Sequence, residues 1–241
     1  MFLILFSIKY VKKYLYRIKM LCASFDIGKK NFSFYVEEFD KNKTTSLATY
    51  NANGTPTFEF ETTLVEIYTN GSTVLLENID ITDGCDPKMT LDPETFHNMT
   101  DVLDRYSEIW DRCSVFIIEK QMMFGKQTNP MAVKLGQHCY SYFAIRYGRF
   151  KNIIEFPAYN KTQILGSEKI AGKLTKTGKI TYKAIDKPKR KKWCISKALE
   201  VLELRDDSKS IVQIQNSKKK DDLCDVICQL QSWKYLYLYN K

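Results

Sequence analysis

The chain has 241 residues, of which 44% are hydrophobic, and a formal net charge of +9. This length supports one sizeable core, so we expect a single elaborated domain, and the excess of lysine and arginine indicates a polyanionic partner such as nucleic acid. Seven cysteines without a CxxC pair exclude a dense disulfide framework and indicate reduced core residues of an intracellular protein.

Residues 1–20 are interpreted as a basic and apolar N-terminal extension. The apolar run over residues 1–8 is soon followed by lysine and arginine, so it is far shorter than the ~20 residues that span a bilayer. A signal peptide would carry its charges before the apolar run and a small-residue cleavage site after it, and this segment has neither. We therefore expect no membrane span and a main domain over residues 21–241, with Met20 as an alternative start.

Two apolar, aromatic-rich runs over residues 21–26 and 31–39 flank the sequence Ile27-Gly28-Lys29-Lys30. This pattern predicts a strand, a tight turn and an antiparallel partner strand. The glycine in the turn lets the backbone pass close to a bound ion or phosphate.

A polar stretch over residues 40–57 contains Asn53-Gly54 and is typical of a loop. The segments 58–68 and 74–81 are predicted as further strands. Their order in the sheet is not predicted.

The pattern changes to alternating helices and strands in the middle of the chain. Apolar residues recur at helical spacing over residues 95–113, which predicts an amphipathic helix that leads into a strand over 115–119. A second helix is predicted over 130–147, opened by Pro130, and a strand over 152–156 follows it.

The stretch 161–192 is rich in lysine, glycine and threonine and is predicted to be a mobile excursion. Helices over 193–204 and 222–237 close the chain. Strands followed by alternating strands and helices indicate an α/β sheet flanked by helices.

Four carboxylates stand where a predicted strand or helix would hold them rigidly. Asp26 and Glu119 end apolar strands, and Asp222 and Asp225 lie side by side at the edge of the apolar stripe of the last helix. A carboxylate at the end of an apolar strand is costly unless something pairs with it. Oxygen ligands from three separated segments, in a chain with two histidines, favour Mg²⁺ or Mn²⁺ over zinc.

Each of these carboxylates also has a structural interpretation. Asp221 and Asp222 could cap the last helix, and Asp26 could belong to a purely structural turn. Glu119 could pair with the lysine that follows it, although neighbours in a strand point to opposite faces. The combination of the four carboxylates favours the metal interpretation.

The ordered motifs SFDIGKKN, IIEKQ, FPAYNKT and KKDDLCDVICQ resemble those of the poxvirus-type Holliday junction resolvases. The set is also similar to that of the fungal mitochondrial resolvases and, more distantly, of bacterial RuvC. The resemblance covers most of the chain from Leu21 onward. It implies an RNase H-like fold, with a mixed five-stranded sheet flanked by helices, and insertions near residues 40–111 and 165–190.

The resemblance implies a homodimeric, Mg²⁺-dependent endonuclease that cuts two opposed strands of a four-way DNA junction. By motif, Asp26, Glu119, Asp222 and Asp225 become metal ligands, and Lys161 in FPAYNKT matches the active-site lysine of the family. Two Mg²⁺ ions, for which Mn²⁺ can substitute, would activate a water and stabilise the leaving 3′ oxygen, so that the product carries a 5′ phosphate. No small-molecule cofactor is expected.

Predicted DNA contacts come from the first turn, from the residue after Glu119 and from the basic run before Trp193. They are Lys29, Lys30, Lys120, Lys187, Lys189, Arg190, Lys191 and Lys192. We expect the basic run to contact phosphates outside the catalytic centre, where contacts position the substrate and carry little sequence information. A nuclear-import signal and a plain solvated loop are alternative interpretations of the same run.

Three other functions compete with junction resolution. An actin-like ATPase or sugar kinase also begins with a DxG loop, but needs a second such domain for which 241 residues are too few. Another RNase H-like nuclease, acting on RNA–DNA hybrids, cannot be separated from a resolvase by sequence. A non-catalytic DNA-binding protein would use the basic surface alone, yet the acidic set would repel DNA. The expected location is intracellular, and for a viral source the host-cell cytoplasm at replication sites, with the nucleus as an alternative.

Overall fold

The computed structural model of the chain describes residues 19–41, 48–121, 129–175, 180–183 and 185–239. The main sheet contains β1 (Lys19–Asp26), β2 (Phe32–Asp40), β3 (Ser72–Ile79), β4 (Val115–Lys120) and β5 (Asn152–Pro157). Its strand order is β3-β2-β1-β4-β5, and it includes antiparallel and parallel pairs. The predicted mixed five-stranded sheet is therefore confirmed.

β1 is the central strand because both of its faces are apolar. Residues 20–25 are all buried, and the strand pairs antiparallel with β2 on one side and parallel with β4 on the other. A strand that is covered on both faces needs such a near-continuous apolar run.

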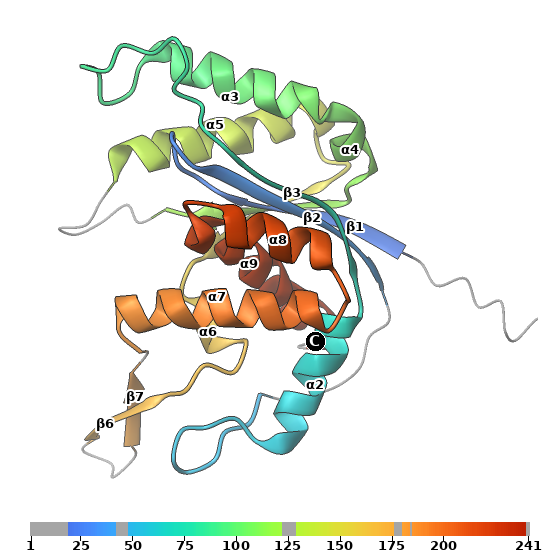
Figure 1. Cartoon of the computed structure of the whole chain (residues 1–241), viewed down its shortest axis with the longest axis vertical. Helices are drawn as coiled ribbons and strands as arrows, with labels where there is room; N and C mark the ends of the chain where they lie inside the picture. The colour runs from blue at the N-terminus through green and yellow to red at the C-terminus, as the bar shows by residue number, and fades with distance from the viewer. Residues whose placement is uncertain (1–18, 42–47, 122–128, 176–179, 184, 240–241) are drawn as a thin grey trace, which may run out of the picture.

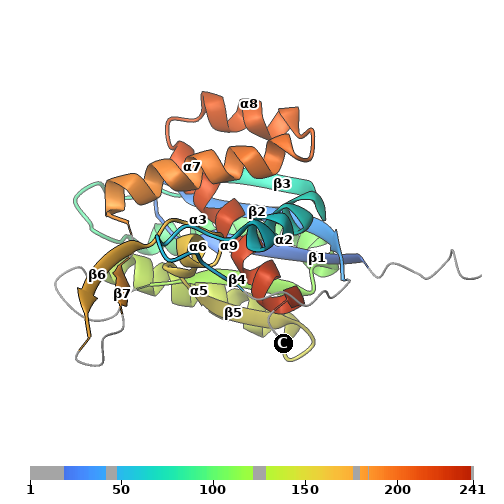
Figure 2. The ribbon, with the colours of Figure 1, turned by 90° about the horizontal axis from the view of Figure 1, so that it is seen from below.

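Helices cover both faces of this sheet (Figure 1). One face carries α3 (Pro93–Arg105), α4 (Ser107–Arg112) and α5 (Pro130–Tyr147), and the other side carries α2 (Phe58–Thr69), α7 (Lys187–Glu203), α8 (Ser208–Asn216) and α9 (Lys220–Tyr239). Aromatic rings fill the first layer, where Phe116 and Phe143 stack with 3.9 Å between ring centroids. The buried residues of α9 contribute much of the second core, and Figure 2 shows this helix crossing the face of the sheet beside α7.

The segment 58–68, predicted as a strand, is helix α2, so that prediction is wrong. Thr57 caps the helix by accepting a hydrogen bond from the backbone N–H of Phe60. Phe60, Leu64 and Ile67 recur at helical spacing and are buried in the second core. The aromatic and β-branched composition suggested a strand, but the period of the buried residues is that of a helix.

The stretch 161–192, predicted as a mobile excursion, contains regular structure in its described part. It includes most of α6 (Asn160–Gln163), an antiparallel pair of β6 (Ile170–Leu174) and β7 (Ile180–Lys183), and the start of α7. α7 begins before the predicted residue 193 because Asp186 caps it, accepting a hydrogen bond from the backbone N–H of Lys189 at 2.9 Å, and because Pro188 suits a first turn.

Other differences are smaller. The helix predicted over 95–113 is divided at Tyr106 into α3 and α4, and α8 is an additional helix before α9. Residues 19 and 20 begin β1, whereas the rest of the predicted extension over 1–20 lies outside the described residues. Among the described helices, none combines the length and the apolar character needed to cross a bilayer.

Candidate active site

The pairing of β1 with β4 places Asp26 beside Glu119. The two strands run parallel, and Phe25 lies opposite Ile118 in their register. Their carboxyl ends therefore meet at one edge of the sheet, with an acidic residue next in each strand. Burial, followed by the nearby Glu119 carboxylate, raises the pKa of Asp26 well above its ordinary value.

Helix α9 brings Asp222 and Asp225 to the same edge. Its position on the sheet is fixed by two buried polar side chains. The Ser24 hydroxyl donates a hydrogen bond to a backbone carbonyl of α9 at 2.9 Å, and the Gln229 amide donates to backbone carbonyls of β1 and β4 at 3.1 and 3.0 Å. These contacts lie close to the two aspartates along the helix, so they set the height of the aspartates above the strand ends.

The four carboxylates are electrostatic neighbours. Asp225 and Asp222 add to the upward shift of the Asp26 pKa that burial and Glu119 begin. Burial, and then repulsion from Asp221, raises the pKa of Asp222 to about 6. Burial is the largest cause of both shifts, and repulsion between the crowded carboxylates adds to it.

Lys161 supplies the positive charge at this site. Its ammonium group donates to Glu119 Oε2 at 2.5 Å and to Asp225 Oδ2 at 3.2 Å, and its side chain is 5% exposed. Burial alone would lower the pKa of this ammonium, but Asp225, Glu119 and Asp26 together raise it well above its ordinary value. The stretch that begins at Lys161 was predicted to be mobile, whereas the short helix α6 directs Lys161 into the acidic cluster.

The donor set of the cluster suits a hard divalent cation, because it consists of carboxylate oxygens from three separated segments. In the described part of the chain, no three His, Cys, Asp or Glu side chains are already arranged as a metal site. The ammonium of Lys161 instead lies between Glu119 and Asp225. The residues therefore fit Mg²⁺ or Mn²⁺ by chemistry and charge, and binding requires these side chains to reorient.

A pocket of about 190 Å³ opens at the cluster, and side chains of α7 contribute to its lining. Glu119, Lys161 and Asp225 line it together with α7 side chains, which include Lys187, Arg190 and Lys191. These three cations of the basic run therefore line the same pocket as three residues of the acidic cluster. The start of α7 places them at the pocket, which a mobile loop would not do.

The remaining predicted DNA contacts do not line this pocket. Lys189 and Lys192 are exposed on α7, and Lys30 and Lys120 are exposed next to the strands that carry the acidic residues. Lys29 donates a hydrogen bond at 2.8 Å to a backbone carbonyl of the segment before α3.

Sequence reasoning missed the residues that hold this site in place. Ser24 and Gln229 are buried polar residues in otherwise apolar segments, which is a signal that the sequence does contain. Asp221, which the sequence offered only as a possible helix cap, has a side chain that is 19% exposed and pairs with Lys191. This ion pair ties the basic start of α7 to the acidic start of α9.

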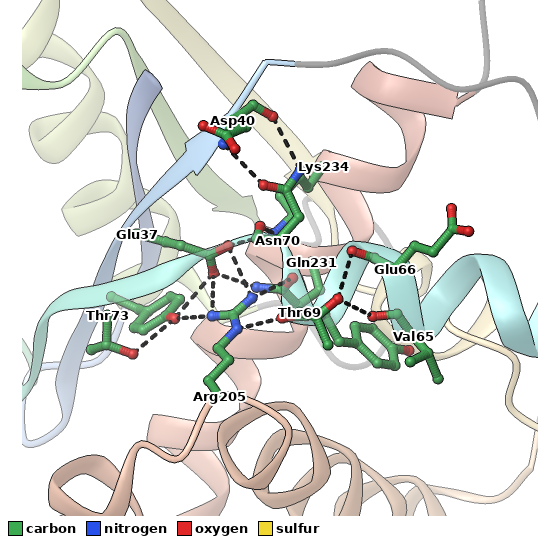
Figure 3. A network of polar contacts seen from close by, with 12 residues as sticks. Glu37, Asp40, Val65, Glu66, Thr69, Asn70, Thr73, Arg205, Gln231 and Lys234 are labelled. Atoms are coloured by element: carbon green, nitrogen blue, oxygen red, sulfur yellow. Dashed lines mark hydrogen bonds and ion pairs between the residues drawn. The ribbon is translucent and has the colours of Figure 1, made fainter. Parts of the chain in front are cut away.

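A second charged cluster, which the sequence did not predict, lies along the same helix (Figure 3). Glu37 of β2 accepts hydrogen bonds from both terminal nitrogens of Arg205 at 3.0 Å and from Lys234 of α9 at 2.5 Å. Gln231 also donates to the Glu37 carboxylate, and Lys234 donates to the backbone carbonyl of Asn70. The side chains of Glu37 and Lys234 have no exposed surface.

The chain is similar to proteins of two invertebrate iridescent viruses. It is 36% identical to the uncharacterized protein 170L of invertebrate iridescent virus 6, over 91% of this chain and 90% of the relative. It is 29% identical to the uncharacterized protein 97L of invertebrate iridescent virus 3, over 89% of this chain and 99% of the relative. No protein-family model matches the chain.

Among solved structures, the chain is similar to the Fowlpox virus resolvase in its complex with Holliday junction DNA. The TM-score is 0.51 and the identity is 16%, with coverage of 91% of this chain and 99% of that chain. The expected resemblance to the poxvirus-type resolvases is thereby confirmed at the level of the fold.

Proposed function

The chain belongs to the family of protein 170L of invertebrate iridescent virus 6, and from its fold and acidic site we propose that it is a divalent-metal-dependent endonuclease that resolves four-way DNA junctions. The relatives point to a viral setting, in which such an enzyme would process recombined or concatemeric genomes at replication sites.

One observation carries the proposal: carboxylates from β1, β4 and α9 converge with a buried lysine at the end of the sheet. Asp26, Glu119, Asp222 and Asp225 are the proposed metal ligands. A cluster with this much uncompensated negative charge is costly in a protein that only binds DNA, because it repels the backbone phosphates. The likeness to a resolvase solved with Holliday junction DNA favours branched DNA over other substrates of the same chemistry.

The residues of the site divide the work of phosphodiester hydrolysis. The carboxylates would hold two Mg²⁺ ions, which when bound supply charge stabilisation and a more acidic attacking water. Lys161 lies within the cluster as a point charge and would offset negative charge that develops on the phosphate. The proposed product has a 5′ phosphate and a free 3′ hydroxyl.

The proposed enzyme acts as a homodimer. A four-way junction is resolved by two cuts on opposed strands, and the acidic cluster around Asp26 would make one of these cuts. Two copies related by a twofold axis would present two equivalent clusters to the two strands. Paired, symmetrically placed nicks in a synthetic junction would support this assembly, and nicks on one strand only would count against it.

The proposal is tested by incubating the purified full chain with a synthetic four-way junction, with Mg²⁺ or with EDTA. We expect cleavage with Mg²⁺ only. Asp26→Asn should lower the cleavage rate on the order of 10³-fold while leaving junction affinity intact, because a metal ligand is lost without a change in shape.

Asp101→Asn is the matched control, because Asp101 is an exposed residue of α3. Normal cleavage by Asp26→Asn would show that the assigned site is wrong. Preferential cleavage of a matched RNA–DNA hybrid would instead reassign the substrate within the same chemistry.

A further inference from the structure

The start of α7 presents its cations in two sets that face different ways. Lys187, Arg190 and Lys191 line the acidic pocket together with Cys194, and these positions follow the i, i+3, i+4, i+7 spacing of one helical face. Lys189 and Lys192 are exposed and lie off this face. The face is fixed in place, because the backbone carbonyl of Cys194 accepts a hydrogen bond from Cys228 of α9 at 3.5 Å.

The cations of the pocket-facing set are not equivalent. Lys191 is paired with Asp221, and so helps to hold α7 against α9. For Lys187 and Arg190, the described part of the chain supplies no ion-pair partner. The two carboxylates across the pocket, Glu119 and Asp225, are themselves occupied by Lys161.

Lys187 and Arg190 have no ion-pair partner among the described residues, so an anion from outside the protein can bind to them. Without a cation on the carboxylates, the wall that they form would repel an anion that entered the pocket alone. When the phosphate that is cut lies over the acidic cluster, the next phosphate of the same DNA strand lies close to it. An arginine beside a lysine suits such a phosphate, because the guanidinium can donate two hydrogen bonds to it and the ammonium adds a point charge.

We propose that Lys187 and Arg190 form a binding site for a single backbone phosphate of the cleaved strand, next to the phosphate that is cut. This inference rests on the proposed nuclease function and extends it. The two residues are positioning residues: they hold the strand in register over the acidic cluster. Lys189 and Lys192 face away from the pocket and contribute to capture of the DNA only.

This division predicts different kinetic effects for equal changes in charge. Misplacing a reacting group by a small distance lowers the rate even when binding is complete, whereas a lost capture contact lowers affinity alone. The Lys187→Gln/Arg190→Gln double variant should therefore lose cleavage rate at saturating enzyme. The Lys189→Gln/Lys192→Gln double variant should lose mainly affinity.

The experiment is single-turnover cleavage of a four-way junction by the full chain with saturating enzyme and Mg²⁺. We expect the saturated rate to fall at least tenfold further in Lys187→Gln/Arg190→Gln than in Lys189→Gln/Lys192→Gln. Arg190→Lys, which keeps the charge and loses the paired hydrogen bonds, should fall between Arg190→Gln and the wild type. Equal losses in the two double variants would overturn the inference. Melting temperatures of all variants exclude a loss of fold as the cause.

A second measurement does not depend on cleavage. Inorganic phosphate added with Mg²⁺ should raise the melting temperature of the wild type and of Lys189→Gln/Lys192→Gln, and should leave that of Lys187→Gln/Arg190→Gln unchanged. The same response in all three proteins would overturn the phosphate site. Absence of cleavage by the wild type would sink the nuclease proposal, and the phosphate response would still decide the site.

Discussion

Two clusters of lysine and carboxylate lie against α9, and they are built in opposite ways. At the start of the helix, Asp225 shares Lys161 with Glu119 and Asp26, and Asp222 adds a further negative charge nearby. Further along the helix, the Glu37 carboxylate lies between Arg205 and Lys234 and has no exposed surface (Figure 3). The first cluster has an excess of negative charge and borders a pocket, whereas the second is closed and has an excess of positive charge.

The pKa shifts follow this difference. Burial alone would raise the pKa of Glu37, but Arg205 and Lys234 lower it below its ordinary value. For Asp26, burial and neighbouring carboxylates raise the pKa, and Lys161 only partly opposes them. The same residue types therefore leave an excess of positive charge in one cluster and an excess of negative charge in the other. Shifted carboxylates beside an open pocket are typical of functional sites.

The largest effect on stability is expected for Glu37→Gln. This substitution leaves two buried cations without the carboxylate that lies between them. Removing one partner of a buried ion pair costs about 3–5 kcal/mol, so we expect the free energy of unfolding in urea to fall by about that amount.

Glu119→Gln is the matched comparison, because it removes one negative charge from the cluster that has too many. We expect its unfolding free energy to stay within about 1 kcal/mol of the wild type. Losses of equal size in the two variants would mean that both clusters are structural.

The second prediction compares Lys161→Met with Lys234→Met in the metal-free protein. Lys161→Met leaves the crowded carboxylates without a positive charge beside them. We expect it to lower the free energy of unfolding by about 2 kcal/mol. Lys234→Met should cost about 1 kcal/mol, because Glu37 keeps its pairing with Arg205. Thermal unfolding with EDTA measures both.

Addition of Mg²⁺ separates these two lysine variants. The ion should restore the melting temperature of Lys161→Met, because it replaces the missing positive charge, and should leave that of Lys234→Met unchanged. Equal rescue of both variants would argue that Mg²⁺ acts on the protein surface in general.

The difference between the clusters also explains what the sequence could predict. Asp26 and Glu119 were found because each ends an apolar strand, a local pattern that fixes where the side chain emerges. The partners of Glu37 lie 168 and 197 residues away along the chain, and no local pattern joins positions so distant. Sequence reasoning therefore located the acidic site and missed the closed cluster.

Helices and strands could be predicted where the apolar residues followed a single spacing along the chain. The helix over 130–147 was predicted with the bounds that the structure shows. Segment 58–68 failed because its composition favours a strand while its buried residues follow a helix. The pocket-facing cations of α7 could not be separated from Lys189 and Lys192 until the helix was known to start at Lys187.

The third prediction concerns the pH dependence of the metal-free protein. Burial and Asp221 raise the pKa of Asp222 from 3.8 to about 6 in the folded state. A group whose folded pKa is raised contributes stability that is full below the unfolded pKa and is lost as pH rises through the folded pKa. We therefore expect stability with EDTA to decline between about pH 4 and pH 6, by about 1 kcal/mol after allowance for solvent screening.

Two variants assign this pH dependence to its cluster. Asp222→Asn should reduce the decline, which urea unfolding at a series of pH values would measure, and the part that remains belongs to Asp26, whose pKa is also raised. Glu37 has a lowered pKa, so its contribution is present above its unfolded value and is lost as pH falls through the folded one. The loss of stability at acid pH should therefore be smaller in Glu37→Gln than in the wild type. An unchanged decline in Asp222→Asn together with an unchanged acid loss in Glu37→Gln would contradict the comparison.

The smallest effect is expected from salt. Asp225 is 30% exposed in the acidic cluster, whereas Glu37 is fully buried, and mobile ions screen exposed charges much more than buried ones. At neutral pH, Asp222→Asn should raise the unfolding free energy of the metal-free protein. This gain should be smaller at high salt than at low salt, by roughly a few tenths of a kcal/mol. The loss of unfolding free energy in Glu37→Gln should stay constant over the same range of salt. Urea unfolding in NaCl at fixed pH measures both, and a salt-dependent cost for Glu37→Gln would show that solvent reaches the second cluster and that it is not closed.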